Sequence, residues 1–88
     1  MKPIIFSPHA LEQLILRGGT ESEVESAIRE GEKLPARLGR IAFRKNFSFL
    51  SNWKGRYYEV KQVTPIVVED EDRIVVVTVY VFYFGGAE

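Results

Sequence analysis

Two spacings of apolar residues divide the chain into a helical first part and a strand-rich second part. A short apolar stretch at Ile4–Phe6 is followed by Ser7-Pro8, which supplies an N-cap and a proline at the first helical position. Apolar residues then recur at helical spacing, with successive side chains about 100° apart, until Gly18-Gly19 ends the pattern. The face expected to point toward the core carries Ala10, Leu11, Leu14 and Ile15. The pattern therefore predicts a short strand and then a helix.

A second helix is predicted directly after the first. The segment Thr20–Glu23 has the form of a capping box, in which the threonine covers a free amide of the first turn and the glutamate reaches back. Its apolar stripe and its terminating glycine follow at helical spacing: Val24, Ala27, Ile28 and Gly31. Two helices joined by so short a loop predict a helical hairpin.

From residue 38 onward, β-branched and aromatic runs separated by turn residues replace the helical spacing. They predict an antiparallel meander with one bent strand or two short strands at residues 40–51, further strands at 56–68 and 73–84, and turns at 52–55 and 69–72. Pro65 cannot donate a ladder hydrogen bond, so it predicts a bulge or an unpaired edge within the second of these strands. The expected fold class is α+β, with the N-terminal helical hairpin packed on one face of an antiparallel sheet and residues 1–88 forming one domain.

The last apolar run, Ile74–Phe84, predicts a strand in the interior of the sheet because both of its faces are apolar. Because successive side chains of a strand point to opposite faces, one face carries an aliphatic row and the other carries a row of mixed side chains. The aliphatic row, on which we expect the helices to pack, is Val75, Val77, Val79 and Val81. The mixed row is Val76, Thr78, Tyr80 and Phe82. We expect the helices to leave the mixed row uncovered, so that it can form a groove, a homodimer contact or a binding site for a partner.

The composition narrows the chemistry that the chain can perform. With 45% apolar and 27% charged residues it is typical of a globular protein. The absence of cysteine excludes disulfides, thiolate metal sites and a cysteine nucleophile, and a single histidine excludes a histidine-rich zinc site. The sequence implies no cofactor and no metal. The apolar run of residues 74–84 is about half the length of a membrane-spanning helix, so we expect a cytoplasmic protein without a membrane partner.

Charge is unevenly distributed along a chain whose net charge is zero. Residues 33–61 contain eight lysines and arginines and one carboxylate, a net charge of +7, whereas both flanking segments are acidic. Clustered cations raise the local potential even in a neutral molecule, which favours an anionic partner such as RNA. The alternative is a solvated surface of strands.

The chain resembles a known family in two segments. The segment FSPHALEQLILRGGTESEVESAIREGE, from Phe6 to Glu32, is similar to the opening of a family of small uncharacterised bacterial and archaeal domains. These domains share a His-Ala helix start, an Arg-Gly helix end and a following Ser/Thr-Glu-Glu-Val type helix. The segment IVVVTVY resembles their last strand. The matching positions here are His9-Ala10, Arg17-Gly18, Thr78 and Tyr80, and the chain departs from the family pattern at Gln13 and Gly19.

The family is grouped with the RelE/ParE-type toxins, whose fold is an N-terminal helical hairpin on an antiparallel sheet. The resemblance therefore implies a RelE-like, metal-independent ribonuclease of a toxin–antitoxin system, or an inactive relative that has kept the fold. It also implies RNA or the ribosome as the target and an antitoxin-like protein as a partner.

Metal-independent RNA cleavage needs a base for the 2′-hydroxyl proton, donors for the phosphate oxygens and an acid for the leaving oxygen. His9 is the only side chain that ordinarily titrates near neutrality, and arginines supply phosphate donors. The catalytic candidates are His9, Arg40 and Arg44. The RNA-binding candidates are Arg17, Arg37, Lys45, Arg56, Tyr58, Lys61 and Tyr80, and Glu59 or a tyrosine is a candidate second proton carrier.

Each of these residues also has a purely structural interpretation. His9 can simply occupy the helix start, Arg17 can complement a helix C-terminus, and alternating strands interleave cations with aromatics whenever one face is buried. A helix-turn-helix DNA reader is disfavoured, because the glutamates of the second predicted helix would face phosphates. The alternative to a ribonuclease is a non-catalytic module that binds protein or RNA with the aromatic sheet face.

Overall fold

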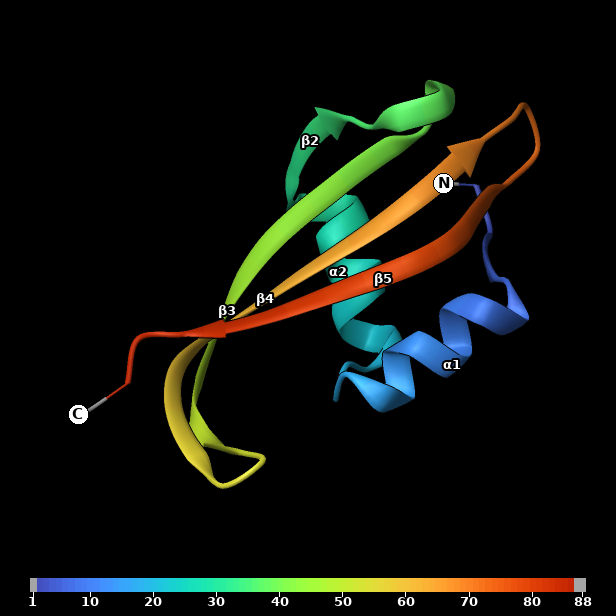
Figure 1. Ribbon diagram of the computed structural model, residues 1–88. Helices are drawn as coiled ribbons and strands as arrows, with labels where there is room; N and C mark the ends of the chain where they lie inside the picture. The colour runs from blue at the N-terminus through green and yellow to red at the C-terminus, as the bar shows by residue number, and fades with distance from the viewer. Residues whose placement is uncertain (1, 87–88) are drawn as a thin grey trace.

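The computed structural model describes residues 2–86, in which five strands and two helices are joined by short connections (Figure 1). The elements in chain order are β1 (Ile4–Phe6), α1 (Pro8–Leu16), α2 (Glu21–Glu30), β2 (Glu32–Pro35), the 3-10 turn η1 (Arg37–Gly39), β3 (Ile41–Trp53), β4 (Arg56–Glu69) and β5 (Ile74–Phe84). The predicted α+β class is confirmed. Strand β2 was not predicted; its residues are mostly charged, so it lacks the apolar alternation of a half-buried strand.

The sheet is mixed, with the strand order β1-β5-β4-β3-β2. Strands β2 to β5 pair antiparallel with their neighbours, but β1 runs parallel to β5, with Ile4 beside Ile74. The expectation of a purely antiparallel sheet is therefore wrong at this edge. Three residues of local sequence hold no information on the direction in which they pair with a strand 70 positions later.

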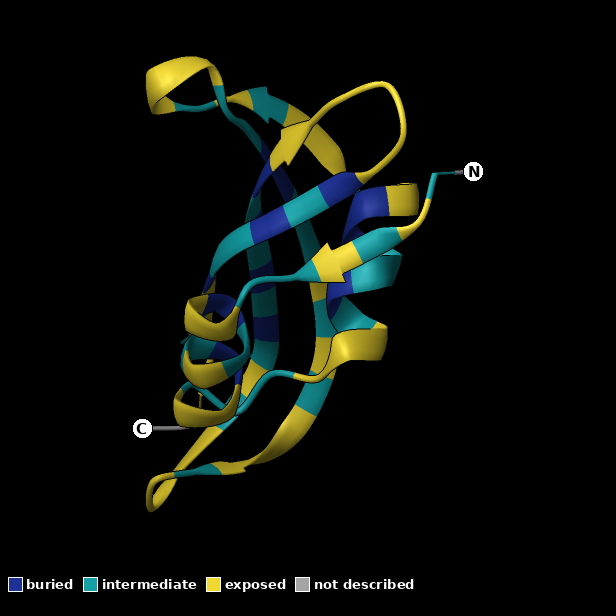
Figure 2. Ribbon diagram, turned by 90° about the vertical axis from the view of Figure 1, so that its right-hand side faces the viewer, coloured by how far each residue is buried: buried dark blue, intermediate teal, exposed yellow. Residues whose placement is uncertain are grey.

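Both helices lie on the same face of this sheet, α1 along β5 and α2 across β3 and β4 (Figure 1). Buried residues of the helices and of the strands pack together in one core. Figure 2 shows buried residues in dark blue on both helices and strands. The helical contribution is Ala10, Leu14, Val24 and Ile28, and the strand contribution includes Val63, Val67, Val76 and Val79. Neither helix between residues 2 and 86 has the length and apolarity that crossing a membrane requires.

The predicted helix termini are confirmed. The Ser7 hydroxyl accepts from the Ala10 amide at 3.0 Å, and the capping box at Thr20 has both of its hydrogen bonds. One predicted core residue of α1 is wrong, because Ile15 is 76% exposed. Helix α1 lies near one margin of the sheet, so only a narrow stripe of it is covered.

A β-bulge in β5 changes which of its residues face the helices. Ile66 pairs with Thr78 but Val67 pairs with Val76, so Val77 is an extra residue without a partner on β4. The bulge reverses the alternation, and Val76 and Val79 are both fully buried. The expected row of Val75, Val77, Val79 and Val81 toward the helices is therefore wrong before the bulge. The prediction of a bulge or an unpaired edge at Pro65 is wrong, because Pro65 pairs in regular register with Val79, β4 is a central strand, and the extra residue lies on β5.

Strand β5 is interior only where β1 covers it, along Ile74–Val76. Beyond that point it is an edge strand, which corrects the expectation that the whole strand is interior. The N-terminal part of the chain covers the start of this edge: the Ser7 N–H donates to the Val76 carbonyl at 3.0 Å, and Arg17 donates to the Val79 carbonyl at 2.7 Å. The last aromatic residues on the open face stay half exposed: Tyr80, Phe82 and Phe84.

Candidate functional site

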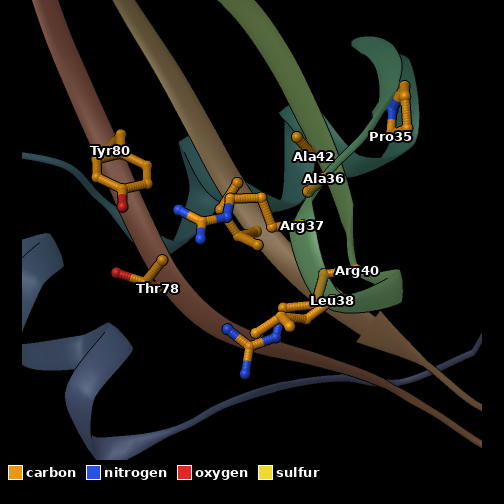
Figure 3. A pocket seen from close by; sticks show the side chains of 9 residues that line it. Pro35, Ala36, Arg37, Leu38, Arg40, Ala42, Thr78 and Tyr80 are labelled. Atoms are coloured by element: carbon orange, nitrogen blue, oxygen red, sulfur yellow. The ribbon is translucent and has the colours of Figure 1, made fainter.

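A groove of about 580 Å³ lies on the sheet face that the helices leave open (Figure 3). Ala42, Ile66 and Thr78 form its floor, one from each of three neighbouring strands, and they are cross-strand partners that point to the same face. Tyr80 stands on one side, and residues 35–40 of the β2–β3 connection stand on the other. Its size suits a small ligand or a nucleotide of a longer chain.

Two arginines extend from the β2–β3 connection into this groove. Figure 3 shows the side chains of Arg37 and Arg40 reaching from η1 toward β5. The connection is held by two backbone hydrogen bonds, from Ala36 N–H to the Arg40 carbonyl (2.9 Å) and from Arg40 N–H to the Arg37 carbonyl (3.2 Å). None of the described residues that line the groove is a carboxylate. The groove therefore presents positive charge that no lining residue neutralises.

His9 adjoins the groove from the start of α1. Its Nε2 lies 3.4 Å from the Thr78 hydroxyl, and Thr78 is part of the groove floor. The helix start is fixed there because the Ser7 hydroxyl also donates to the Val77 carbonyl at 3.3 Å. An exposed imidazole is thus held at the margin of a cationic groove.

Arg17 ends α1 and connects it to the aromatic side of the groove. Its guanidinium donates to the Val79 carbonyl and lies 5.0 Å above the centre of the Tyr80 ring, within the range of a cation–π contact. The Tyr80 ring in turn stacks against Phe82, with the ring centres 6.2 Å apart and the planes inclined by 14°. This arrangement fixes Tyr80, which lines the groove.

Two further predicted residues lie on β3 but are already paired. Arg44 is on the groove face of β3, where its Nη2 lies 2.5 Å and its Nε 3.1 Å from the same Glu32 oxygen. The next residue, Lys45, points to the helix side and pairs with Glu30 at 2.5 Å. The hydrogen bond and charge of Lys45 lower the pKa of the Glu30 carboxyl below its ordinary value. The structure does not bring Lys45 to the groove.

Lys61 is buried on the helix side of the sheet, with 4% of the residue exposed. Its ammonium group donates to the Gly18 carbonyl at 2.5 Å and lies 2.8 Å from the Glu23 carboxylate. It also lies 5.7 Å from the centre of the Phe49 ring. The structure therefore does not bring Lys61 to the groove: it lies on the opposite face of the sheet, covered by the helices and the loop between them.

Arg56, Tyr58 and Glu59 belong to the far end of β4. Arg56 lies over the ring of Tyr58, which contacts Tyr83 at 5.5 Å between ring centres. Tyr58 is eight residues along the strand from Ile66 of the groove floor, a distance of about 26 Å at the usual rise of a strand. These three residues do not line the groove.

Sequence reasoning missed two features. One is the pair of residues between the two groove arginines, and the other is the buried hydroxyl of Thr64. Leu38 lines the groove, and the dipeptide Leu38-Gly39 between two arginines is the only local signal of its turn. Thr64 pairs with Tyr80 across the strands, and its buried hydroxyl has no hydrogen-bond partner within residues 2–86. Within the same residues, no three His, Cys, Asp or Glu side chains are grouped so that they can hold a metal ion.

We compared the chain with models of protein families, with curated proteins and with solved structures, and none of the three comparisons gave a match.

Proposed function

We propose that the protein is a metal-independent ribonuclease of the RelE/ParE toxin type that holds a single strand of RNA in the groove. The observation that supports this proposal is that candidate residues from distant parts of the chain lie close together at the groove. Three residues selected from the sequence line the groove, which has no lining carboxylate: Arg37, Arg40 and Tyr80. Two more contact lining residues, His9 at Thr78 and Arg17 at Tyr80. The order of two helices before the long strands also agrees with the toxin fold that the sequence resembles.

The proposed reaction is attack of the RNA 2′-oxygen on the adjacent phosphorus. His9 takes the 2′-hydroxyl proton while Arg40 and Arg37 donate hydrogen bonds to the non-bridging oxygens, where negative charge increases in the transition state. The bond from phosphorus to the 5′-oxygen breaks, and the Tyr80 hydroxyl or a water gives that oxygen a proton. The products are a 2′,3′-cyclic phosphate and a 5′-hydroxyl end.

Arg40 is the better phosphate donor of the two arginines proposed for catalysis. Arg40 lines the groove, whereas Arg44 does not line it and has its guanidinium on Glu32. An arginine that already binds a carboxylate must break this ion pair before it can bind a phosphate. We therefore assign phosphate stabilisation to Arg40 and a structural role to Arg44.

The test is cleavage of a single-stranded RNA, free and on ribosomes, in the presence of EDTA. We expect His9→Ala to reduce the cleavage rate by about 10²-fold or more, the usual contribution of a general acid or base, and Arg40→Ala to reduce it strongly too. Neither side chain belongs to the core, so the melting temperatures should stay close to that of the parent. Arg56→Ala, which removes a cation outside the groove, is the matched control and should cleave normally.

A parent protein without cleavage in either assay would contradict the catalytic proposal, as would a fully active His9→Ala variant. The second candidate function is then a non-catalytic RNA-binding module. It is favoured by the environment of His9, because the only hydrogen bond of its ring among the described residues is a long one to Thr78, and no lining carboxylate orients the imidazole. In that case Arg37→Ala and Arg40→Ala weaken RNA binding and His9→Ala does not.

An antitoxin-like protein or a second copy of the chain is the remaining proposed partner. The half-exposed aromatic strip of Tyr80, Phe82 and Phe84, on the edge strand β5, is the surface proposed for either of them. Size-exclusion chromatography of the parent and of Phe82→Ser distinguishes a homodimer from a monomer.

A further inference from the structure

Leu38 combines an uncommon backbone conformation with an exposed apolar side chain at the rim of the groove. Its φ is +60°, and the following Gly39 has a φ of +71°. Positive φ at both central positions, closed by the hydrogen bond from Arg40 N–H to the Arg37 carbonyl, is the arrangement of a type I′ hairpin turn. Leu38 is 86% exposed and lines the groove.

Neither the turn nor the core explains a leucine at this position. Type I′ turns favour asparagine, aspartate or glycine, and a leucine held at positive φ costs on the order of 1 kcal/mol. Because the side chain is 86% exposed, the free energy gained by burying it offsets almost none of this cost. The other hairpin turn with two positive φ values uses Lys54-Gly55, whose first residue is charged and suits the solvent.

The neighbours of Leu38 indicate what it meets when the groove is occupied. Arg37 and Arg40 flank it in the same turn, and Thr78 and Tyr80 lie across the groove. The two hydrogen bonds that close the turn hold the leucine in place between the two cations. A ligand drawn by these cations is anionic, and the part of it that suits a leucine is apolar and lies next to its charge. Single-stranded RNA has this alternation, because every phosphate is followed by a base with a flat apolar face.

We propose that Leu38 is a base-binding residue, which packs on the face of one nucleobase while the flanking arginines hold the neighbouring phosphates. Tyr80 forms the opposite side of the same subsite. This inference rests on the proposed function, since it takes the groove to be the RNA site, and it adds that bases are bound there through apolar contact. It makes no use of cleavage, so binding alone tests it.

The experiment measures binding of two oligomers to the parent and to Leu38→Gly: a single-stranded RNA, and an oligomer of the same length built from abasic ribonucleotides. Glycine accepts positive φ and removes the side chain, so this variant should melt no lower than the parent. We expect about tenfold weaker binding of RNA, the scale set by burying one leucine side chain, and unchanged binding of the abasic oligomer. The dependence on salt should stay the same because no phosphate contact is lost.

Leu50→Gly is the matched control. Leu50 is also an exposed leucine at positive φ, with φ +46° and 61% exposure, but it lies on β3 outside the groove, so this variant should bind both oligomers like the parent. Arg40→Ala serves as the positive control and should weaken both. If Arg40→Ala weakens binding while Leu38→Gly does not, or if Leu38→Gly weakens both oligomers equally, the base contact is overturned and the RNA groove stands. If the parent binds neither oligomer, both proposals fall.

Discussion

Lys61 carries its charge inside the molecule, where two oxygens replace water. The Gly18 carbonyl and the Glu23 carboxylate accept from its ammonium group, and both belong to the chain just before or within α2. The lysine therefore joins the loop between the helices to the central strand β4. Removing one member of such a buried pair leaves the other without a partner, which costs more than the pair itself contributes.

We predict that Lys61→Ala lowers the stability of the protein by about 2–3 kcal/mol, since the Glu23 side chain retains some access to water. Urea unfolding followed by circular dichroism measures this. Lys54→Ala, which removes an exposed cation from a turn, is the control and should change stability by less than about 0.5 kcal/mol. A Lys61→Ala protein that is as stable as the parent but binds RNA less well would return Lys61 to the RNA-binding set.

At the scale of elements, the bulge at Val77 decides which side chains of β5 point toward the helices. Without it, strict alternation would continue the row of Val77 and Val79, as the sequence pattern predicts. With it, Val76 and Val79 both enter the core, and Val77 keeps partial contact with solvent. After the bulge, Thr78 and Tyr80 lie on the open face beside His9 and Arg17, as the alternation in the sequence predicts.

Aspartate substitutions on the two sides of the bulge test this arrangement. We expect Val79→Asp to lower stability by about 3 kcal/mol or more, because it places an unpaired charge at a fully buried position. Val77→Asp should cost less than half as much, since its carboxylate can reach water. Thermal melts of the two purified variants compare them directly. Equal losses, or a larger loss at Val77, would contradict the register given by the bulge.

At the scale of the whole molecule, the fold divides the basic middle segment among three places. The described part of the chain measures 46 × 24 × 23 Å. Figure 1 shows η1, whose residues line the groove, toward one end and the β3–β4 turn at the other. Arg37 and Arg40 reach the groove, Lys45 and Lys61 lie on the helix side, and Arg56 stands near the distant turn. The net charge of +7 in the sequence therefore overstates the charge that one ligand can meet.

We predict that RNA affinity falls with salt and that only groove cations set the slope. For a single strand the logarithm of affinity falls by about 0.7 per phosphate contact for each tenfold rise in salt. Arg37→Ala should therefore reduce the slope by about 0.7. Arg56→Ala should leave it unchanged. Fluorescence anisotropy with a labelled RNA over a range of salt concentrations gives both slopes, and equal effects of the two variants would mean that the whole basic segment acts as one surface.

The sequence by itself determined the elements whose cause is local. Ser7-Pro8 and the capping box at Thr20 begin helices because their side chains bind amides within one turn of the chain. The long strands followed equally from β-branched and aromatic runs, with each of their six boundaries within two residues of the prediction. These signals act between residues a few positions apart, so the sequence contains them in full.

Tertiary structure decided everything that depends on contacts between distant parts of the chain. The parallel pairing of β1, the bulge at Val77 and the burial of Lys61 each require a partner from another element. The candidate site has the same origin. His9 was selected from the sequence for its chemistry, but its place beside Thr78 follows from packing α1 along β5, a contact 69 positions apart in the chain. A periodic pattern shows which side of an element is buried, whereas the partner on that side is chosen by the free energy of the whole packed core.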